Sequence, residues 1–333
     1  MTILITGGAG YIGSHTCVEL LAEGYDIVVA DSLVNSTMEA VNGIKKISGK
    51  DFPFYKTDIR DEAELDKIFA GHHIGCVIHF AGLKAVGESV AKPILYYDNN
   101  LNSTINLCKM MKKYDVRRVI FSSSATVYRF DSPMPLSEES PLGAINPYGW
   151  TKFMCEQVLR DAAQVEENWS VVLLRYFNPV GAHESGVIGE NPRGVPNNIM
   201  PYIAQTAQGL HEKLNIFGGD YETGDGTGVR DYIHVVDLAK GHVKSVDYAM
   251  ENAGCEAFNL GTGKGVSVME LLEAFKQVND VHVPHTIAAR RPGDSAVSYA
   301  DPAKAERMLG FKAEKTLEDM CRDTWQYQSS PGC

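Results

Sequence analysis

The fold is decided by residues 2–13, which read TILITGGAGYIG. A short apolar, β-branched run is followed by glycines, and the residues after them begin a helix. The glycines fit two overlapping patterns, Gly7-x-x-Gly10-x-x-Gly13 and Gly8-x-Gly10-x-x-Gly13. Glycine lets the backbone bend through positive φ and approach a ligand closely, and a helix N-terminus offers free N–H groups to a pyrophosphate. A glycine triplet is often only a turn, but its place between a strand and a helix indicates a dinucleotide site.

The next strand indicates which dinucleotide binds. Residues 25–30 read as a strand that ends on Asp31. An acidic side chain about 20 residues beyond the glycine turn accepts hydrogen bonds from the adenosine ribose 2′-OH and would repel a 2′-phosphate. Residues 32–40 contain no Arg or Lys to counter that repulsion. The sequence therefore predicts NAD rather than NADP.

Composition limits the class of protein. The chain has 333 residues and a formal net charge of −11, and it is 44% hydrophobic and 22% charged, as is typical of a soluble globular protein. Lys and Arg are scattered along the chain, which argues against a nucleic-acid-binding face. No apolar run approaches the roughly 20 residues that a membrane helix needs. Because the N-terminus already reads as a strand, we expect no signal peptide.

Cysteine and histidine spacing argues against a metal site. The seven cysteines are widely spaced and form no Cys-x-x-Cys pair, which is typical of reduced thiols in a cytosol. Five histidines without metal-ligand spacing are His15, His72, His73, His79 and His234. We therefore expect a cytoplasmic protein with no metal, no nucleic-acid partner and no membrane partner.

Strand and helix patterns alternate as far as residue 176. Further strands are predicted at 52–56, 76–80, 116–122 and 170–176, and helices at 61–69, 93–114 and 147–167. The strand at 76–80 is almost continuously apolar, as expected of a strand that is covered on both faces. This alternation predicts an α/β fold with a Rossmann-like, doubly wound parallel sheet.

The pattern changes beyond residue 178. Gly, Pro and Asn become frequent, and short strands at 214–217, 257–260 and 281–283 are interleaved with helices. We therefore predict an NAD-binding Rossmann domain over residues 1–178 and a smaller C-terminal α/β substrate-binding lobe over residues 179–333. The boundary is soft, because a helix near 234–250 could pack back on the first domain.

The candidate catalytic residues are Tyr148, Lys152 and Ser124. Tyr148 and Lys152 are four residues apart on a predicted helix and so project from one face. A free phenol titrates near pH 10, and a nearby ammonium and nicotinamide charge would lower that pKa. The pair alone is common by chance, but it follows the serine run 122–124 at the carboxyl end of a strand, where ligands of open α/β sheets bind. Ser122 and Ser123 fit structural or cofactor contacts better.

These motifs resemble those of the extended short-chain dehydrogenase/reductases. Within that superfamily the whole chain is similar to the UDP-glucose (UDP-galactose) 4-epimerase family. The stretches that carry the resemblance are GYIGSHT (10–16), HFAGLKAVGES (79–89), SSSATVY (122–128), LRYFNPVGA (174–182), PNNIMPY (196–202) and DGTGVRDYIH (225–234). Matches in this order along the chain are far more specific than the glycine pattern alone.

The resemblance implies reversible 4-epimerisation of UDP-glucose and UDP-galactose through a transient 4-keto sugar and NADH. Tyr148 would take the proton of the sugar 4-hydroxyl while C4 gives hydride to NAD, and the keto sugar would then turn over and receive the hydride on its other face. Ser124 would hydrogen-bond O4, and Lys152 would hold the nicotinamide ribose and tune Tyr148. The resemblance also implies a homodimer formed by the helix at 93–114 and the helix that carries Lys152.

The resemblance also implies the binding residues. With the glycines of the turn, the cofactor set is Gly7, Gly10, Tyr11, Ile12, Gly13, Asp31, Asn35, Ser36, Asp58, Ile59, Phe80, Ala81, Gly82, Lys84, Asn99, Tyr148, Lys152 and Phe177. The substrate set is Ser124, Asn178, Asn198, Ile199, Ile216, Phe217, Arg230, Arg291, Asp294 and Ser298. An Arg opposite a diphosphate makes bidentate, charge-assisted hydrogen bonds, which favours Arg230 and Arg291, with Arg290 as an alternative to its neighbour.

One departure from the family and one specificity position stand out. Arg129 and Phe130 follow Tyr128, where the family usually has Gly and an acidic residue, so the local turn is in question. The family position that limits sugar size falls on Ser298, with Tyr299 directly after it. Family members with Tyr at that position exclude N-acetyl sugars, so the small side chain predicts that UDP-GlcNAc and UDP-GalNAc are also accepted.

Three other functions were weighed. A nucleotide-sugar 4,6-dehydratase needs an extra acid–base pair directly after the strand serine, where this chain has Ala125 and Thr126. A decarboxylase or dehydrogenase acting on UDP-sugars is a weaker alternative. A non-catalytic NAD-sensing regulator tends to lose the tyrosine or the lysine, and both are present here. The sequence therefore favours the epimerase.

Overall fold

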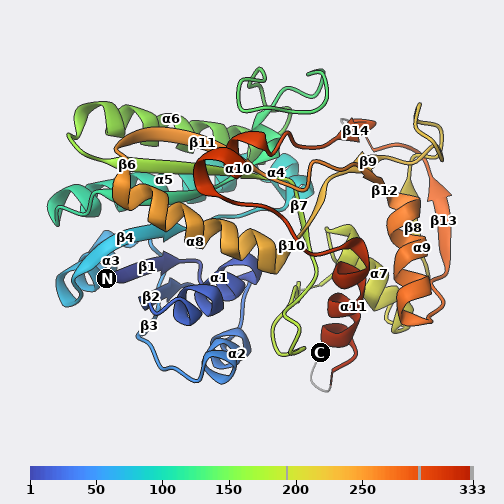
Figure 1. Cartoon of the computed structure of the whole chain (residues 1–333), viewed down its shortest axis with the longest axis horizontal. Coiled ribbons are helices and arrows are strands. Elements are labelled where there is room, and N and C mark those ends of the chain that lie inside the picture. Colours follow the sequence, from blue (N-terminus) through green and yellow to red (C-terminus); the bar gives the residue numbers. More distant parts are fainter. Residues whose placement is uncertain (193, 292–293, 331–333) are drawn as a thin grey trace.

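The first strand of the chain lies inside a parallel sheet whose order is β11-β6-β5-β4-β1-β2-β3 (Figure 1). The structure is a computed structural model that describes residues 1–192, 194–291 and 294–330. The strands are β1 (Thr2–Thr6), β2 (Asp26–Asp31), β3 (Phe54–Lys56), β4 (Ile74–His79), β5 (Arg118–Ser124), β6 (Ser170–Tyr176) and β11 (Gly254–Leu260). β1 pairs in parallel with β2 on one side and β4 on the other, so the strand order reverses here. The predicted doubly wound sheet is confirmed, and ligands of such sheets bind at this reversal.

Alternate residues of β1 serve two separate cores, because successive side chains of a strand point to opposite faces. Ile3 and Ile5 pack with α1 (Tyr11–Ala22), α2 (Met38–Ser48) and α8 (Val235–Glu251). Leu4 packs with α3 (Glu62–Gly71), α5 (Pro93–Lys113) and α6 (Pro147–Val165) on the other face. The carboxyl ends of the strands, between these helical layers, are left to form the site.

A smaller lobe follows β6 and lies beside the main sheet (Figure 1). Its strand pairs are β7 (Asn178–Val180) with β10 (Tyr232–His234), β8 (Leu214–Phe217) with β13 (His285–Ala288), and β9 (Val229–Arg230) with both β12 (Val266–Ser267) and β14 (Val297–Ser298). Its helices are α7 (Ile199–Ala207), α9 (Val268–Asn279) and α11 (Leu317–Gln328). They enclose a core of their own around Ile203, Leu272 and Phe275.

The strand predicted at 281–283 is wrong. Val283 is fully buried in the core of the smaller lobe, so its apolar pattern reflects packing rather than strand pairing. Pro284 has no N–H to donate and instead accepts a hydrogen bond from the N–H of Leu214. The strand β13 therefore begins one residue later, at His285.

The chain returns to the main sheet after it has entered the smaller lobe. α8 packs against α1, as the sequence suggested for the helix near 234–250. The sequence analysis predicts the strand at 257–260 as part of the smaller lobe. In the structure this strand is β11, which pairs with β6 at the edge of the main sheet over its whole length. A division into domains at residue 178 remains a prediction.

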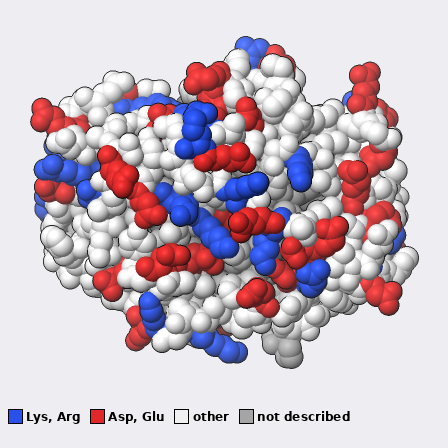
Figure 2. All heavy atoms as spheres, in the orientation of Figure 1, with Lys and Arg blue, Asp and Glu red and all other residues white. Residues whose placement is uncertain are grey.

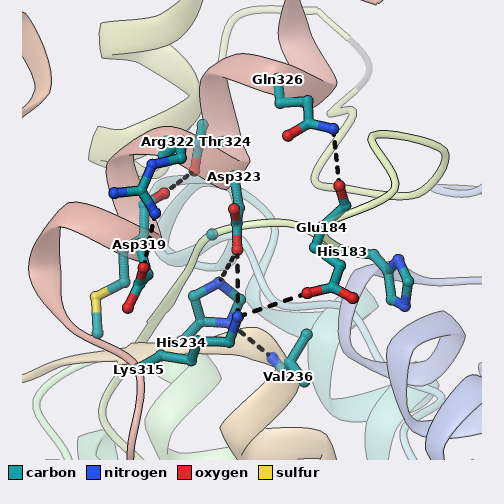
Figure 3. A network of polar contacts seen from close by, with 12 residues as sticks. His183, Glu184, His234, Val236, Lys315, Asp319, Arg322, Asp323, Thr324 and Gln326 are labelled. Atoms are coloured by element: carbon teal, nitrogen blue, oxygen red, sulfur yellow. Dashed lines mark hydrogen bonds and ion pairs between the residues drawn. The ribbon is translucent and has the colours of Figure 1, made fainter. Parts of the chain in front are cut away.

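Polar contacts fasten α11 to the rest of the chain (Figure 3). His234 Nε2 lies 3.1 Å from Asp323 Oδ2 in a buried hydrogen bond. Lys315 Nζ lies 3.8 Å from the same carboxylate and 4.0 Å from Glu184. Gln326 donates to the carbonyl oxygen of Glu184 at 2.7 Å. The C-terminal helix is thereby tied both to β10 and to the segment after β7.

The surface carries charges of both signs. Figure 2 shows Lys and Arg interspersed with Asp and Glu on the face viewed, without a continuous basic area. None of the helices in the described part of the chain combines the length and the apolar character needed to span a membrane.

Candidate active site

The glycine turn forms a cradle that a Cβ atom would fill. Gly7 has φ +72°, and a Cβ there would lie 2.7 Å from the backbone nitrogen of Ala81. A Cβ on Gly13 would collide with the carbonyl oxygen of Gly7. Gly10 is the N-cap of α1 and has no side chain to satisfy the first N–H groups of that helix. The turn therefore fits the pyrophosphate of NAD.

Asp31 closes the other side of this cradle. Its Oδ2 accepts from the N–H of Ala9 at 3.0 Å, and its Oδ1 accepts from the N–H of Leu33 and from Ser36 Oγ, both at 2.8 Å. The carboxylate thus braces the glycine turn and the loop after β2, a role that sequence reasoning missed. Each carboxylate oxygen has further lone-pair capacity, so the group can still accept from a ribose hydroxyl.

The remaining predicted cofactor residues line the carboxyl edge of the sheet. Phe80 and Ala81 follow β4 and donate their N–H groups to the carbonyl oxygen of Thr6, at 2.9 and 3.0 Å. Asp58 follows β3 and pairs with Arg60 at 2.7 Å. Elsewhere along this edge, Ile59 and Phe177 are buried and Asn99 is half-buried.

Asn100, which sequence reasoning missed, braces the loop after β4. Its Oδ1 accepts from the N–H of Leu83 at 2.8 Å, and its Nδ2 donates to the carbonyl oxygen of Leu83 and to Thr151 Oγ1. A Cβ on Gly82 would lie 3.2 Å from Asn100 Oδ1, so glycine permits this close approach. The signal in the sequence is the second asparagine next to Asn99.

Lys84 lies beside the glycine turn but has a protein partner. Its Nζ is 3.0 Å from Glu190 Oε1 and 5.9 Å from the centre of the Tyr11 ring. Asn198 Nδ2 donates to the same glutamate oxygen at 2.6 Å. Lys84 and Asn198, predicted to contact different ligands, are thus joined by Glu190, which the sequence analysis did not single out.

Tyr148, Lys152 and Ser124 are brought together at the end of β5. Asn146 caps α6 by accepting from the N–H of Gly149 at 2.9 Å, which places Tyr148 in the first turn. Lys152 Nζ donates to the carbonyl oxygen of Ser122 at 2.5 Å and lies 6.0 Å from the centre of the Tyr148 ring. The predicted catalytic residues therefore converge on one point at the carboxyl edge of the sheet.

The pKa of Tyr148 differs from the expectation. Burial raises it to about 12, and the hydrogen bond with Ser124 lowers it only in part. Burial also lowers the pKa of the neighbouring Lys152, to about 8, and its ammonium donates to the carbonyl oxygen of Ser122. A phenolate at Tyr148 therefore needs a further positive charge nearby.

The two predicted diphosphate residues lie close together in the smaller lobe. Burial raises the pKa of Tyr232. The positive charges of the Arg230 and Arg291 guanidiniums both oppose that increase, so both lie near its phenol. Arg291 also stacks over the Phe217 ring at 5.1 Å and pairs with Asp294 at 2.8 Å. These contacts place the arginines on one wall, next to the half-exposed Phe217 ring.

Arg290, the alternative to Arg291, points to a different place. It pairs with Asp220 at 2.7 Å and stacks over the Tyr221 ring at 4.2 Å. This geometry favours Arg291 as the residue that faces a ligand.

Other predicted substrate residues are less directly placed. Ile216 is buried in the core of the smaller lobe, so only its backbone could contact a ligand. Ile199 opens α7 and Asn178 is exposed at the start of β7. Ser298 pairs with Arg230 in the β14–β9 ladder, so the position predicted to limit sugar size lies beside the arginine wall.

The segment with Arg129 and Phe130 folds as a loop closed by backbone bonds. Arg129 N–H donates to the carbonyl oxygen of Pro141 at 2.9 Å, and its side chain pairs with Asp131 at 2.6 Å. The Phe130 side chain is 62% exposed. The departure from the family pattern thus changes the loop surface and leaves the serine strand intact.

Comparison with known proteins decides the family. The GDP-mannose 4,6 dehydratase family matches residues 4–324. The chain is 59% identical over 330 residues to a UDP-glucose 4-epimerase of Bacillus subtilis, covering 99% of this chain and 97% of that protein. A solved UDP-glucose 4-epimerase of Bifidobacterium longum, in complex with NAD+ and UDP, has a TM-score of 0.96 at 52% identity and covers 99% of this chain and 98% of that one.

The chain belongs to the UDP-glucose 4-epimerase family. These comparisons confirm the predicted epimerase activity and the predicted NAD dependence. The dehydratase alternative is not favoured, although a family with that description also matches. Ala125 and Thr126 begin a short 3-10 helix where a dehydratase needs its acid–base pair.

A further epimerase structure bears on the sugar. The UDP-Glc/GlcNAc 4-epimerase of Campylobacter jejuni has a TM-score of 0.85 at 36% identity and covers 98% of each chain. Epimerases of this fold therefore include a UDP-Glc/GlcNAc 4-epimerase.

Proposed function

We propose that this chain interconverts UDP-glucose and UDP-galactose by epimerisation at C4, with Tyr148, Lys152 and Ser124 at the reacting carbon. The observation that carries this proposal is the convergence of these three residues beside the glycine cradle. The arginine wall of Arg230 and Arg291 supports a nucleotide diphosphate as the handle of the substrate.

The cradle and the sheet edge would hold NAD. The glycine turn and the N-terminus of α1 fit the pyrophosphate, and Asp31 fits the adenosine ribose. When bound, NAD supplies a reversible acceptor for the hydrogen at C4 of the sugar. Lys152 is placed to hold the nicotinamide ribose, since its buried ammonium lies at the end of β5.

Tyr148 would accept and return the proton of the 4-hydroxyl. Because burial raises its pKa to about 12, the phenol needs nearby positive charge to act as a base at neutral pH. The Lys152 ammonium and the nicotinamide charge would supply that charge. Ser124 Oγ accepts from Thr126 N and Thr126 Oγ1 at 3.2 and 3.0 Å, which leaves its own hydroxyl proton to donate to O4.

The nucleotide half of the substrate would lie along the smaller lobe. Arg230 and Arg291 fit the diphosphate, and Asp294 holds Arg291 in place at 2.8 Å. The remaining predicted contacts to the nucleotide are Asn178, Asn198, Ile199, Ile216 and Phe217. The half-exposed ring of Phe217 supports a stacking contact with the base.

Ser298 supports a site that also takes N-acetylated sugars. Its small side chain lies on β14, in register with Arg230, and so faces the same wall. We therefore propose UDP-GlcNAc and UDP-GalNAc as further substrates, and the UDP-Glc/GlcNAc 4-epimerase of Campylobacter jejuni supports the first of them.

A homodimer and a cytoplasmic location are also proposed. α5 and α6 carry apolar side chains that are exposed in the single chain, with Ile94 at 77%, Ile105 at 39% and Met154 at 38%. If α5 and α6 packed against α5 and α6 of a second copy, these side chains would be covered. Every cysteine among the described residues is a free thiol, which supports a reducing compartment.

The test is product analysis of the purified protein with UDP-galactose and, separately, with UDP-GalNAc, without added NAD. Appearance of UDP-glucose in the first reaction is expected and would support epimerisation with a retained cofactor. Appearance of UDP-GlcNAc in the second is expected from Ser298. If neither sugar changes even after NAD is supplied, the proposed function is wrong.

A further inference from the structure

A buried ion pair lies directly behind the candidate catalytic residues. Glu156 and Arg175 are each only 1% exposed. Arg175 Nε lies 2.9 Å from Glu156 Oε1, and Arg175 NH2 lies 2.6 Å from Oε2. Burying two charges costs free energy, and apolar side chains of similar volume are often as stable. Stability alone is therefore a weak reason for this pair, and its geometry indicates another.

Glu156 shares a helix face with the catalytic residues. Tyr148, Lys152 and Glu156 are spaced four residues apart on α6, so they project from the same side. Lys152 Nζ donates to the carbonyl oxygen of Ser122 at 2.5 Å, and Ser123 Oγ donates to Glu156 Oε1 at 2.5 Å. Tyr148 hydrogen-bonds with the next serine along β5. This helix face is thus fastened to three consecutive residues of the serine strand.

Arg175 extends the attachment to the neighbouring strand. It lies opposite Ser123 in the β5–β6 ladder, and both side chains reach the Glu156 carboxylate. Its NH1 donates to Tyr128 Oη at 3.1 Å, and Tyr128 donates to Asn259 Oδ1 on β11 at 2.6 Å. Three strands of the sheet and the catalytic helix therefore meet at one carboxylate and its guanidinium.

We propose that Glu156 and Arg175 are positioning residues of the reaction, which hold α6 in register with β5 so that Tyr148 and Lys152 face Ser124. This inference rests on the proposed function of those three residues. Neither Glu156 nor Arg175 lies among the residues expected to contact NAD or the sugar, so both act through the groups that they hold.

The pair also sets the charge around Lys152. Burial lowers the pKa of Lys152 to about 8, and the Glu156 carboxylate opposes that decrease. His79 on β4 faces the same ammonium but is kept neutral, because burial lowers its pKa to about 3. Burial raises the pKa of the Cys155 thiol, which therefore stays neutral as well.

The centre of the Tyr148 ring lies 6.0 Å from the Lys152 ammonium, and two guanidiniums bind Glu156. These are Arg175 on β6 and, at 3.6 Å from the carboxylate, Arg160 on α6. Glu156 opposes the decrease that burial causes in the pKa of Lys152, so without the Glu156 charge the ammonium should lose its proton at lower pH.

The test begins with Glu156→Gln, measured as the pH profile of kcat with UDP-galactose. We expect kcat to fall by about tenfold to a hundredfold, as for a catalytic group displaced by a fraction of an ångström to an ångström. KM should be almost unchanged, because the nucleotide is held in the smaller lobe. The alkaline limb of the profile should move to lower pH, a shift that a merely structural residue would not cause.

A double variant separates positioning from folding. Glu156→Met with Arg175→Met removes both charges, so that neither is left buried without a partner, and should fold with nearly the original Tm. We expect its kcat to fall as well. Wild-type kcat and an unshifted alkaline limb in both variants would overturn the proposal.

Two controls complete the experiment. Asp237→Asn alters another buried carboxylate, on α8, which accepts from the N–H groups of Glu314 and Lys315. It should lower Tm while leaving the pH profile unchanged. Tyr148→Phe should lower kcat by roughly a hundredfold or more. If it does not, the proposed function fails, whereas this fall together with wild-type behaviour of Glu156→Gln and of the double variant overturns only the positioning role.

Discussion

Tyr148 combines a buried phenol with a proposed role that needs the phenolate. Burial raises its pKa to about 12, whereas a base that works at neutral pH needs a lower value. The Lys152 ammonium and the charge of a bound nicotinamide are the proposed sources of this lowering. The reactivity of this tyrosine therefore depends on the bound cofactor as much as on the fold.

Replacement of Tyr148 by Phe should remove the proton acceptor and little else. We expect kcat for UDP-galactose to fall by roughly a hundredfold to ten-thousandfold, the usual range for a lost acid–base group. The affinity for UDP should stay the same, because the proposed diphosphate contacts, Arg230 and Arg291, lie in the smaller lobe. Initial rates and a calorimetric UDP titration would measure both quantities. Loss of UDP affinity in parallel with kcat would contradict this assignment.

Ser298 gives a prediction about specificity. Ser298→Tyr should abolish turnover of UDP-GalNAc while sparing UDP-galactose, because the larger ring would occupy the volume that an N-acetyl group needs. The ratio of kcat/KM for the two sugars measures the effect. Ser298→Ala is the matched control and should keep both activities. Equal losses for the two sugars in the Tyr variant would refute the role of this position.

At the scale of elements, the sequence predicted best where local and tertiary signals agree. The strands at 2–6 and 170–176 are found with the predicted bounds, since both are apolar runs that become fully paired. Asp61 caps α3 as predicted, and accepts from the N–H groups of Ala63 and Glu64, both at 3.1 Å. Such signals depend only on neighbouring residues.

α2 was not predicted, because what stabilises it lies elsewhere in the chain. Its sequence contains Asn42 and Gly43, which are poor helix formers. Val41 and Ile44 are nevertheless fully buried against the sheet. A Cβ on Gly43 would lie 2.5 Å from the Ile188 side chain, so glycine here permits close packing.

The candidate site likewise contains residues that a local sequence pattern predicts and residues that only distant contacts define. The glycine turn, Asp31 and the Tyr148–Lys152 pair carry local patterns, and the structure brings them to one edge of the sheet. Glu190 and Arg175 have no such local pattern. Glu190 pairs with Lys84, 106 residues away in sequence, and Arg175 pairs with Glu156, 19 residues away. Their contacts emerge only from the folded chain.

The exposed apolar side chains of α5 and α6 give a prediction about assembly. Ile105→Glu combined with Met154→Glu should convert a dimer to a monomer, because a charge buried in a second copy's interface is costly. Sedimentation velocity would measure the change. Leu210→Glu, at an exposed apolar position in the smaller lobe, is the control and should leave the mass unchanged. A wild-type monomer would contradict the proposed dimer.

At the scale of the whole molecule, buried histidines couple stability to pH. Burial lowers the pKa of His15 and His79 to about 3 and that of His242 to about 4. In the unfolded chain these groups titrate near 6.5, so between about pH 6.5 and 4 the unfolded state binds more protons. Stability should therefore be complete above pH 7 and fall as the pH decreases through this range.

Urea unfolding at pH 7 and at pH 5 would measure this dependence. We expect a lower free energy of unfolding at pH 5, and a smaller difference in His242→Gln, which removes one of the buried bases. His73→Gln, an exposed position, is the control and should keep the wild-type dependence. An identical pH dependence in the His242 variant would show that its proton is not involved.

The place of β11 also governs how the protein can be made. β6 is buried along its whole length, but its outer edge is paired only when residues 254–260 arrive. A ribosome must therefore translate residues 254–260 before the nucleotide-binding sheet can close. Until then the nascent chain presents an open strand edge, the kind of edge that recruits strands from other chains.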